Sequence, residues 1–231
     1  MSARAEKLFG QTIAYSIATQ LGKHFFVSTA DHHGPICHPF FLNGNLISAT
    51  QAPALENILV FSMANVSLNN SSVPRGFIFH SDVGHDAPLQ QLTFFPASEK
   101  QRPVFGMPAY TKTDLARLKR NLWSKVRDGS VRMTVAEKII GVIDGIYGAP
   151  AVLAAANFPQ QISLTNTTLW QTFFSPNQIA PRLIYLEQER IAADALVAHH
   201  LAADTIINEL ILGTTLVPLV SRYFDGIRGG F

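Results

Sequence analysis

The spacing of apolar residues changes near residue 108 of this 231-residue chain, and this change limits the folds that the chain can adopt. Before the switch, short runs rich in aromatic and β-branched residues end in polar segments, which is typical of buried strands followed by loops. After it, apolar residues recur at helical spacing. We therefore expect an α/β fold with a strand-rich N-terminal half, whose sheet is flanked by helices, and a mostly helical C-terminal half.

Individual elements follow from the same patterns. Expected strands cover residues 24–30, 58–63, 76–79 and 91–95, and a hairpin is expected around Asn43-Gly44, joining 40–42 to 46–48. Expected helices cover residues 4–21, 113–125, 134–148, 163–174, 187–203 and 205–212. The segment 102–108, with its prolines and Gly106, favours a boundary between a strand-rich region 1–107 that carries the site and a helical region 108–231 packed on it, although both can form a single domain.

Composition narrows the class of protein. With 47% hydrophobic residues the chain has enough apolar surface for a sizeable core, and its formal net charge of +2 argues against a dedicated nucleic-acid surface. The lone Cys37 excludes an internal disulfide and suits a reducing compartment. Uninterrupted apolar stretches are too short to span a bilayer. We expect a cytoplasmic protein without a membrane span, and the sequence leaves its oligomeric state open.

Histidine and aspartate are concentrated in one part of the chain. Five of the eight histidines fall between residues 31 and 86, in the company of three aspartates. These residues are His32, His33, His38, His80, His85, Asp31, Asp82 and Asp86. Most of them follow two of the predicted strands, and ligands of open α/β sheets bind at the carboxyl ends of strands. The distribution therefore predicts one shared site for a small-molecule substrate.

Neutral imidazole and carboxylate groups are the usual ligands of catalytic zinc, manganese or iron. We expect His80, Asp82 and His85 to bind a divalent metal together with one of the adjacent pair His32 and His33, with His32 as the assigned ligand. Asp31, His33 and Asp86 are then the expected acid–base or orienting groups. Such a metal lowers the pKa of its bound water, which predicts a hydrolase acting on a small polar or anionic phosphoester or amide.

The triplet Asp31-His32-His33 after an apolar strand resembles the signature triplet of the DHH phosphoesterases. That resemblance implies manganese held by Asp and His, and hydrolysis of phosphoesters or pyrophosphate. It covers three residues only. The family's other Asp and His motifs lie upstream of the triplet, whereas residues 1–30 of this chain contain no Asp and only His24. The chain is therefore not assigned to that family.

A second polar segment, residues 65–75, is rich in amides and hydroxyls and ends in a guanidinium group. Such groups donate hydrogen bonds to carbonyl, hydroxyl or phosphate oxygens, and an arginine can clamp a carboxylate or phosphate through two bonds. We expect this segment to contact the substrate through Asn69, Asn70, Ser71, Ser72 and Arg75.

Two alternatives to the metal-dependent hydrolase remain open. The same histidines and aspartates suit a metal-free acid–base isomerase or lyase. They can also stabilise turns in a non-enzymatic ligand-binding or interaction module. Both enzymatic hypotheses require the polar turns near residues 31 and 80 to face a common cavity.

Overall fold

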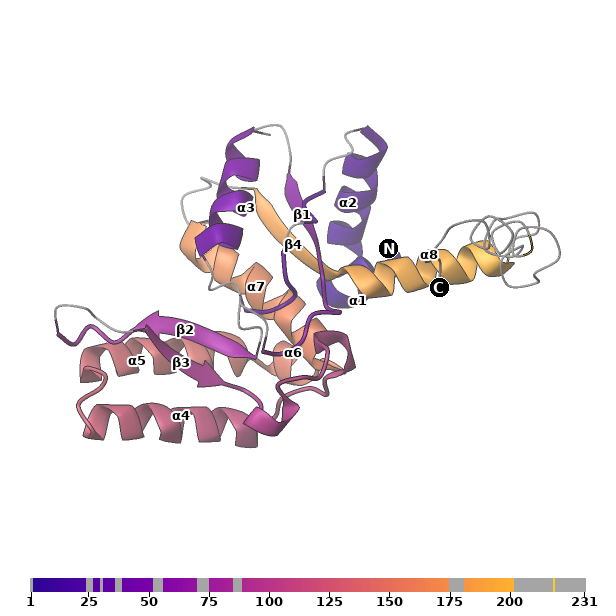
Figure 1. Ribbon diagram of the computed structural model, residues 1–231. Helices are drawn as coiled ribbons and strands as arrows, with labels where there is room; N and C mark the ends of the chain where they lie inside the picture. Colours follow the sequence, from indigo (N-terminus) through magenta and orange to yellow (C-terminus); the bar gives the residue numbers. More distant parts are fainter. Residues whose placement is uncertain are drawn as a thin grey trace, which may run out of the picture. The chain divides into compact units, whose positions relative to one another are not determined.

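The computed structural model describes residues 2–23, 27–29, 31–35, 39–51, 56–69, 75–84, 89–174, 181–201 and 218 (Figure 1). The chain divides into two compact units, Met1–Gln188 and Glu189–Phe231. In the described part of the chain, the named helices and strands belong to the first unit except α8 (Gln188–Leu201), which begins at Gln188, the last residue of that unit. Within the described ranges, no helix has the length and apolar character needed to cross a membrane.

Two helices open the first unit. α1 (Ser2–Phe9) and α2 (Gln11–Lys23) occupy the region where one helix is expected, so the helical prediction is confirmed, but the helix is broken at Gly10. Gly10 has a φ of +85°, a left-handed conformation that glycine adopts without strain and that ends a helix. Its amide still donates to the Glu6 carbonyl at 2.8 Å, so α1 ends in a closed turn.

A small parallel sheet lies at the centre of this unit (Figure 1). β1 (Asn57–Ser62) pairs in parallel with β4 (Arg182–Glu187), with Ile58 opposite Leu183. Both strands are almost completely buried, which explains their nearly continuous apolar sequences. Helices α2 and α3 (Pro39–Gln51) pack against β1, and α7 (Phe158–Phe174) packs against β4.

The segment 27–33 extends this sheet on the other side of β1. Ser28 bridges Val60 and His32 bridges Met63, both in parallel, so four steps along the segment match three along β1. The extra residue is a β-bulge, a feature that redirects the side chains near it. The described part of the strand expected over 24–30 is therefore extended and paired, and residues 24–26 and 30 lie outside the described residues.

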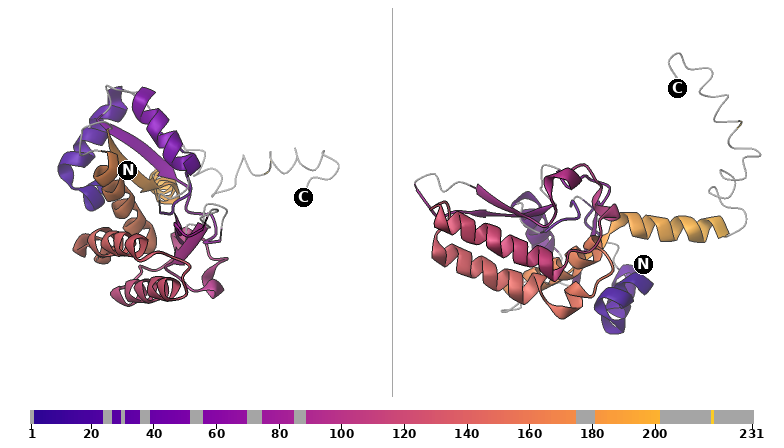
Figure 2. Two further views of the ribbon diagram at one scale, coloured as in Figure 1. Left: turned by 90° about the vertical axis from the view of Figure 1, so that its left-hand side faces the viewer. Right: turned by 90° about the horizontal axis from the view of Figure 1, so that it is seen from below.

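An antiparallel hairpin and two helices form the second group of elements. β2 (Gly76–His80) pairs with β3 (Leu89–Thr93). α4 (Lys112–Arg127) packs against β3 and against α5 (Met133–Val142), which continues into a π-helical turn, η3 (Ile143–Tyr147), as the lower part of Figure 1 and the right-hand view of Figure 2 show. A Cβ on Gly76 would lie 1.7 Å from the Leu92 carbonyl oxygen, so only glycine fits where the hairpin begins.

Short elements connect these groups. Two 3-10 turns, η1 (Ala97–Glu99) and η2 (Val104–Gly106), follow the hairpin, and α6 (Pro150–Leu153) precedes α7. One hydrophobic core includes Leu92 and Leu118, on the two sides of the boundary expected at residue 107. Four aromatic rings pack together in this core, and their contacting pairs have centroid distances between 4.7 and 6.4 Å. The rings belong to Phe94, Tyr110, Tyr147 and Phe158.

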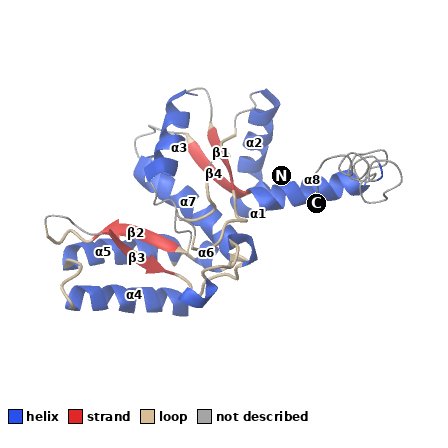
Figure 3. Cartoon of the chain, viewed as in Figure 1, coloured by secondary structure: helices blue, strands red, loops and turns tan. Residues whose placement is uncertain are grey.

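The mixed helix-and-strand class is confirmed, but a strand-rich N-terminal half is not evident, and helix predominates along the described chain (Figure 3). The expected hairpin at 40–48 is wrong, because these residues form α3. Leu42, Leu46 and Ala49 pack on the core at the spacing of successive helical turns, and this packing outweighs the turn tendency of Asn43-Gly44. The expectation of helices after residue 108 also omitted β4, in which residues 183–187 are buried and which pairs with β1.

Candidate functional site

Five buried polar side chains gather where the parallel strands end. Asp31 and His33 come from the bulged segment, Asn45 from α3, Ser62 from the last position of β1 and Tyr185 from β4. None of the five residues is more than 3% exposed. We call these residues the Asp31 cluster. Buried polar groups are costly unless they are hydrogen-bonded, so the partners of each one determine what the cluster does.

Pairing with Met63 determines which of the three consecutive polar residues, Asp31, His32 and His33, turn inward. The Asp31 carbonyl accepts from the Met63 amide, and the His33 amide donates to the Met63 carbonyl, both at 2.8 Å. Asp31 and His33 are buried, whereas His32 between them is half-buried. This alternation is the one expected of an extended segment, in which neighbouring side chains point to opposite sides.

His33 has a partner at each ring nitrogen. Its Nε2 lies 2.8 Å from the Pro159 carbonyl oxygen, and its Nδ1 lies 2.6 Å from the Ser62 Oγ. Because a carbonyl only accepts, Nε2 carries the proton, and Nδ1 of the neutral ring accepts from the serine hydroxyl. Burial lowers the pKa of His33 to about 4, so the ring is neutral at pH 7. His33 thus ties β1 to the start of α7.

Tyr185 lies between the histidine and the carboxylate. Its hydroxyl donates to the His32 carbonyl at 2.6 Å, and its ring centroid is 5.3 Å from that of His33. Burial is the largest cause that raises the pKa of Tyr185 above its usual value, and the nearby charge of Asp31 adds to it. The phenol therefore stays protonated and acts as a hydrogen-bond donor.

Asp31 differs from the other members in having an unused oxygen. Its Oδ2 accepts from the Asn45 Nδ2 at 3.2 Å, whereas its buried Oδ1 has no hydrogen-bond partner among the described residues. Burial raises the pKa of Asp31 to about 6, although the hydrogen bond from Asn45 and the nearby Tyr185 hydroxyl lower it in part. A carboxyl group with such a pKa can both accept and release a proton near neutral pH.

The other predicted site residues are distributed differently. His80 is the last residue of β2, in the hairpin sheet and not in the parallel sheet, and Asp82 lies two residues beyond it; both are exposed. In Figure 1 the arrowhead of β2 points away from β1 and β4. The Asp82 Oδ2 lies 3.6 Å from the Arg132 Nη1. His38, His85 and Asp86 lie outside the described residues, and among the described ones no three His, Cys, Asp or Glu side chains form a group that could hold a metal ion.

The predicted recognition segment is described only at its ends. Asn69 is exposed, and its amide donates to the Lys100 carbonyl at 2.8 Å. Arg75 is half-buried just before β2, and its Nε is buried without a hydrogen-bond partner among the described residues. Asn70, Ser71 and Ser72 lie outside the described residues, so their role in substrate binding stays a prediction.

Asn45, Ser62 and Tyr185 were not among the predicted site residues. Ser62 directly follows the apolar run 58–61, and Tyr185 lies within the run 183–186; such polar groups in buried strands are the signal that could have revealed them. Asn45 was assigned to a hairpin turn, where an asparagine is expected for reasons unrelated to a site.

Comparison of the chain with models of protein families, with curated proteins and with solved structures gives no significant match.

Proposed function

We propose that the protein is an acid–base enzyme that works without a metal, and that the Asp31 carboxyl moves the proton. The expected reactions are those of an isomerase or a lyase acting on a small molecule that has a C–H group next to a carbonyl. The observation that carries this proposal is the buried Asp31 Oδ1, which has no partner among the described residues.

Three physical arguments support Asp31 in this role. A general base works best when its pKa lies near the working pH, and burial brings the pKa of Asp31 to about 6. Asp31 also lies near the carboxyl end of β1, the position at which α/β sheets bind their ligands. Finally, a buried carboxylate with an unsatisfied oxygen costs stability, and polar groups of this kind are concentrated at functional sites.

The proton transfer is simple to write. The ionised Asp31 Oδ1 takes a proton from the carbon next to the carbonyl, and the C–H electron pair moves to form an enolate. The protonated Asp31 then returns the proton to a neighbouring carbon or oxygen, or a leaving group departs from the next carbon. Asn45 orients the carboxyl group through its hydrogen bond, and Tyr185 lies beside it. His33 and Ser62 are positioning residues, because they act through Tyr185 and the strand ends.

The metal-dependent hydrolysis predicted from the histidines stays a prediction. Two members of its expected residue set, His85 and Asp86, lie outside the described residues. The same experiment should therefore distinguish the two chemistries.

The test is proton exchange at carbon, measured by NMR in deuterated water with a panel of small ketones, 2-oxo acids and sugars, in the presence of EDTA. We expect the wild-type protein to exchange a C–H proton of at least one compound. Asp31→Asn, which keeps the size of the side chain and removes the base, should slow this exchange by roughly 10²- to 10⁴-fold.

Asp128→Asn is the matched control, because the Asp128 carboxyl is exposed and far in sequence from the Asp31 cluster. It should exchange at the wild-type rate. Equal rates in the wild type and Asp31→Asn, or no exchange with any compound, would contradict the proposal. Hydrolysis of phosphoesters or amides that EDTA abolishes and manganese or zinc restores would instead support the metal-dependent alternative.

A further inference from the structure

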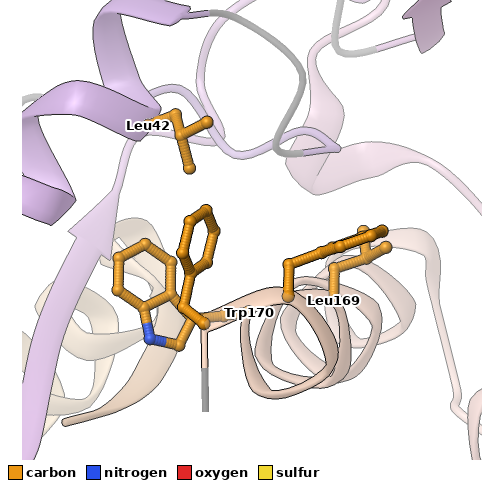
Figure 4. A pocket seen from close by; sticks show the side chains of 5 residues that line it. Leu42, Leu169 and Trp170 are labelled. Atoms are coloured by element: carbon orange, nitrogen blue, oxygen red, sulfur yellow. The ribbon is translucent and has the colours of Figure 1, made fainter. Parts of the chain in front are cut away.

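An apolar pocket lies between α3 and α7, away from the polar side chains of the Asp31 cluster. Its volume is about 430 Å³, and its lining comes from two helices: Leu42 on α3, and Leu169, Trp170, Phe173 and Phe174 on α7. Figure 4 shows Leu42 on one side and Leu169 and Trp170 on the other. This volume is within the range of small-molecule sites, roughly 300 to 1,000 Å³.

On both helices the pocket is one turn from an asparagine that hydrogen-bonds to the segment 31–34. On α3, Leu42 is three residues before Asn45, whose side chain donates to Asp31 at 3.2 Å. On α7, Leu169 and Trp170 come three and four residues after Asn166, whose Nδ2 donates to the Gly34 carbonyl at 2.8 Å. Residues three or four apart share a helix face, and one turn rises about 5 Å.

We infer that this pocket holds the apolar part of the substrate, an aromatic ring or a branched aliphatic group, while the reacting carbon of the same molecule reaches Asp31. This inference rests on the proposed function, since it names the substrate class of that site. A molecule with its polar reacting group about one helical turn from an apolar end would span both places.

The lining favours an apolar group over a polar one. All five lining side chains are hydrophobic, and the indole N–H of Trp170 is already donated to the Pro181 carbonyl at 2.9 Å. Phe173 is 62% exposed, so a ligand in the pocket would cover apolar surface that water now contacts. A flat ring can also stack with the aromatic side chains at favourable edge or offset geometry.

Two ketones with the same reacting group provide the test. Benzylacetone carries a phenyl ring at the end of a short chain, and acetone has the same carbonyl without it. The sequence has two tryptophans, so Trp123→Phe leaves Trp170 as the only one and makes its emission a direct reporter of the pocket. We expect benzylacetone to change this emission with a Kd on the order of a millimolar or below, and acetone to leave it unchanged.

Two further substitutions in this reporter protein identify the pocket. Phe173→Ala should weaken benzylacetone binding roughly tenfold by removing one aromatic wall. Leu169→Trp is a second variant, which fills the pocket and is needed if the side chains around position 173 repack in Phe173→Ala. Because it adds a tryptophan, its binding is followed by the NMR signals of benzylacetone. Phe105→Ala is the matched control, because Phe105 is a partly exposed phenylalanine that does not line the pocket.

The outcomes separate this inference from the proposed function. Binding that Phe173→Ala weakens and Phe105→Ala leaves unchanged, with faster proton exchange of benzylacetone than of acetone, supports both. The same binding pattern without any exchange supports the pocket as an apolar subsite and contradicts the proposed function.

Exchange of both ketones at equal rates without a Trp170 response overturns the pocket inference alone. Trp170 emission that changes with protein concentration but not with benzylacetone would mean that a second copy of the chain covers the pocket, which also overturns it.

Discussion

The parallel-sheet region and the hairpin region of the first unit place their polar residues in opposite ways. The parallel-sheet region, made of residues 27–35 with α3, β1, α7 and β4, buries the Asp31 cluster at the ends of its strands. The hairpin region, made of β2, β3, α4, α5 and η3, keeps many of its charges near the surface in pairs such as Lys119 with Asp144 at 2.8 Å. Its interior side is built from aromatic and aliphatic residues that include Leu92, Leu118 and Leu122.

Two aspartates illustrate the difference. Burial would raise the pKa of Asp114 also, but hydrogen bonds from Thr111 and the adjacent Arg117 outweigh it, and the net pKa falls below its usual value. Among the residues that the structure describes, no charged partner offsets the burial of Asp31, and its pKa rises to about 6. Asp114 stabilises the start of α4 as part of a capping box, whereas Asp31 reduces the stability of the folded state at neutral pH. The comparison indicates that the hairpin region is organised for stability and the parallel-sheet region for chemistry.

The largest expected effect is loss of the aromatic core beside the hairpin. Phe94 is completely buried and stacks on Tyr110 with a centroid distance of 4.7 Å. Phe94→Ala should lower the free energy of unfolding by about 3–5 kcal/mol, because it leaves a cavity in a close-packed core. Urea denaturation measures this, with the partly exposed Phe105→Ala as control. A loss similar to that of the control would mean that the hairpin region does not depend on this core.

The next largest effect is a pH dependence of stability that arises from the buried groups of the parallel-sheet region. Burial raises the pKa of Asp31 from 3.8 to about 6, so the folded state holds this proton more tightly and stability falls as the pH rises through that window. Burial lowers the pKa of His33 from 6.5 to about 4, so stability falls as the pH drops through that window. The two contributions oppose each other in the wild-type protein.

Single substitutions should separate these contributions. In Asp31→Asn the His33 contribution remains, and stability should rise by about 3 kcal/mol between pH 4 and 6.5. In His33→Gln the Asp31 contribution remains, and stability should fall by about 3 kcal/mol between pH 3.8 and 6. Urea denaturation across this pH range gives the change in the free energy of unfolding with pH for each variant. This change can be compared even if the variants differ in overall stability. Parallel profiles for the two variants would contradict the opposed assignment.

The smallest effect is expected at the start of α4. The Thr111 Oγ1 accepts from the Asp114 amide at 3.3 Å, and the Asp114 carboxylate accepts from the Thr111 amide at 2.9 Å. Thr111→Ala should cost about 1 kcal/mol by removing this cap. Thr113→Ala, an exposed position inside the helix, should cost nothing measurable, and thermal unfolding distinguishes the two. An equal loss in both variants would argue against the capping box.

Sequence patterns predicted the parts of this fold that depend on local spacing. The helices that became α2, α4 and α7 and the strands β1 and β2 follow from apolar periodicity, because each buries one face or all of its residues. At Asn43-Gly44 the local pattern predicted a hairpin turn and was wrong, because long-range packing of Leu42 and Leu46 makes that segment helical. No local pattern could show that His80 would join a different sheet from Asp31.

The candidate site was predicted in part for the same reason. Asp31 was identified because it follows an apolar strand, which is a local signal. Its partners Asn45 and Tyr185 are 14 and 154 residues away along the chain, and only the fold brings them together. Burial, which decides the pKa of Asp31, depends on those distant partners and cannot be read from the neighbouring sequence.

The most direct measurement is an NMR titration of the Asp31 side-chain carboxyl carbon in the folded protein, assigned by the loss of its signal in Asp31→Asn. The proposed function requires a carboxyl group that exchanges its proton near neutral pH, so we predict a midpoint near pH 6. A midpoint near 3.8, the usual value for an aspartate, would show that the group is solvated or paired, and it would contradict Asp31 as the proton-transferring residue.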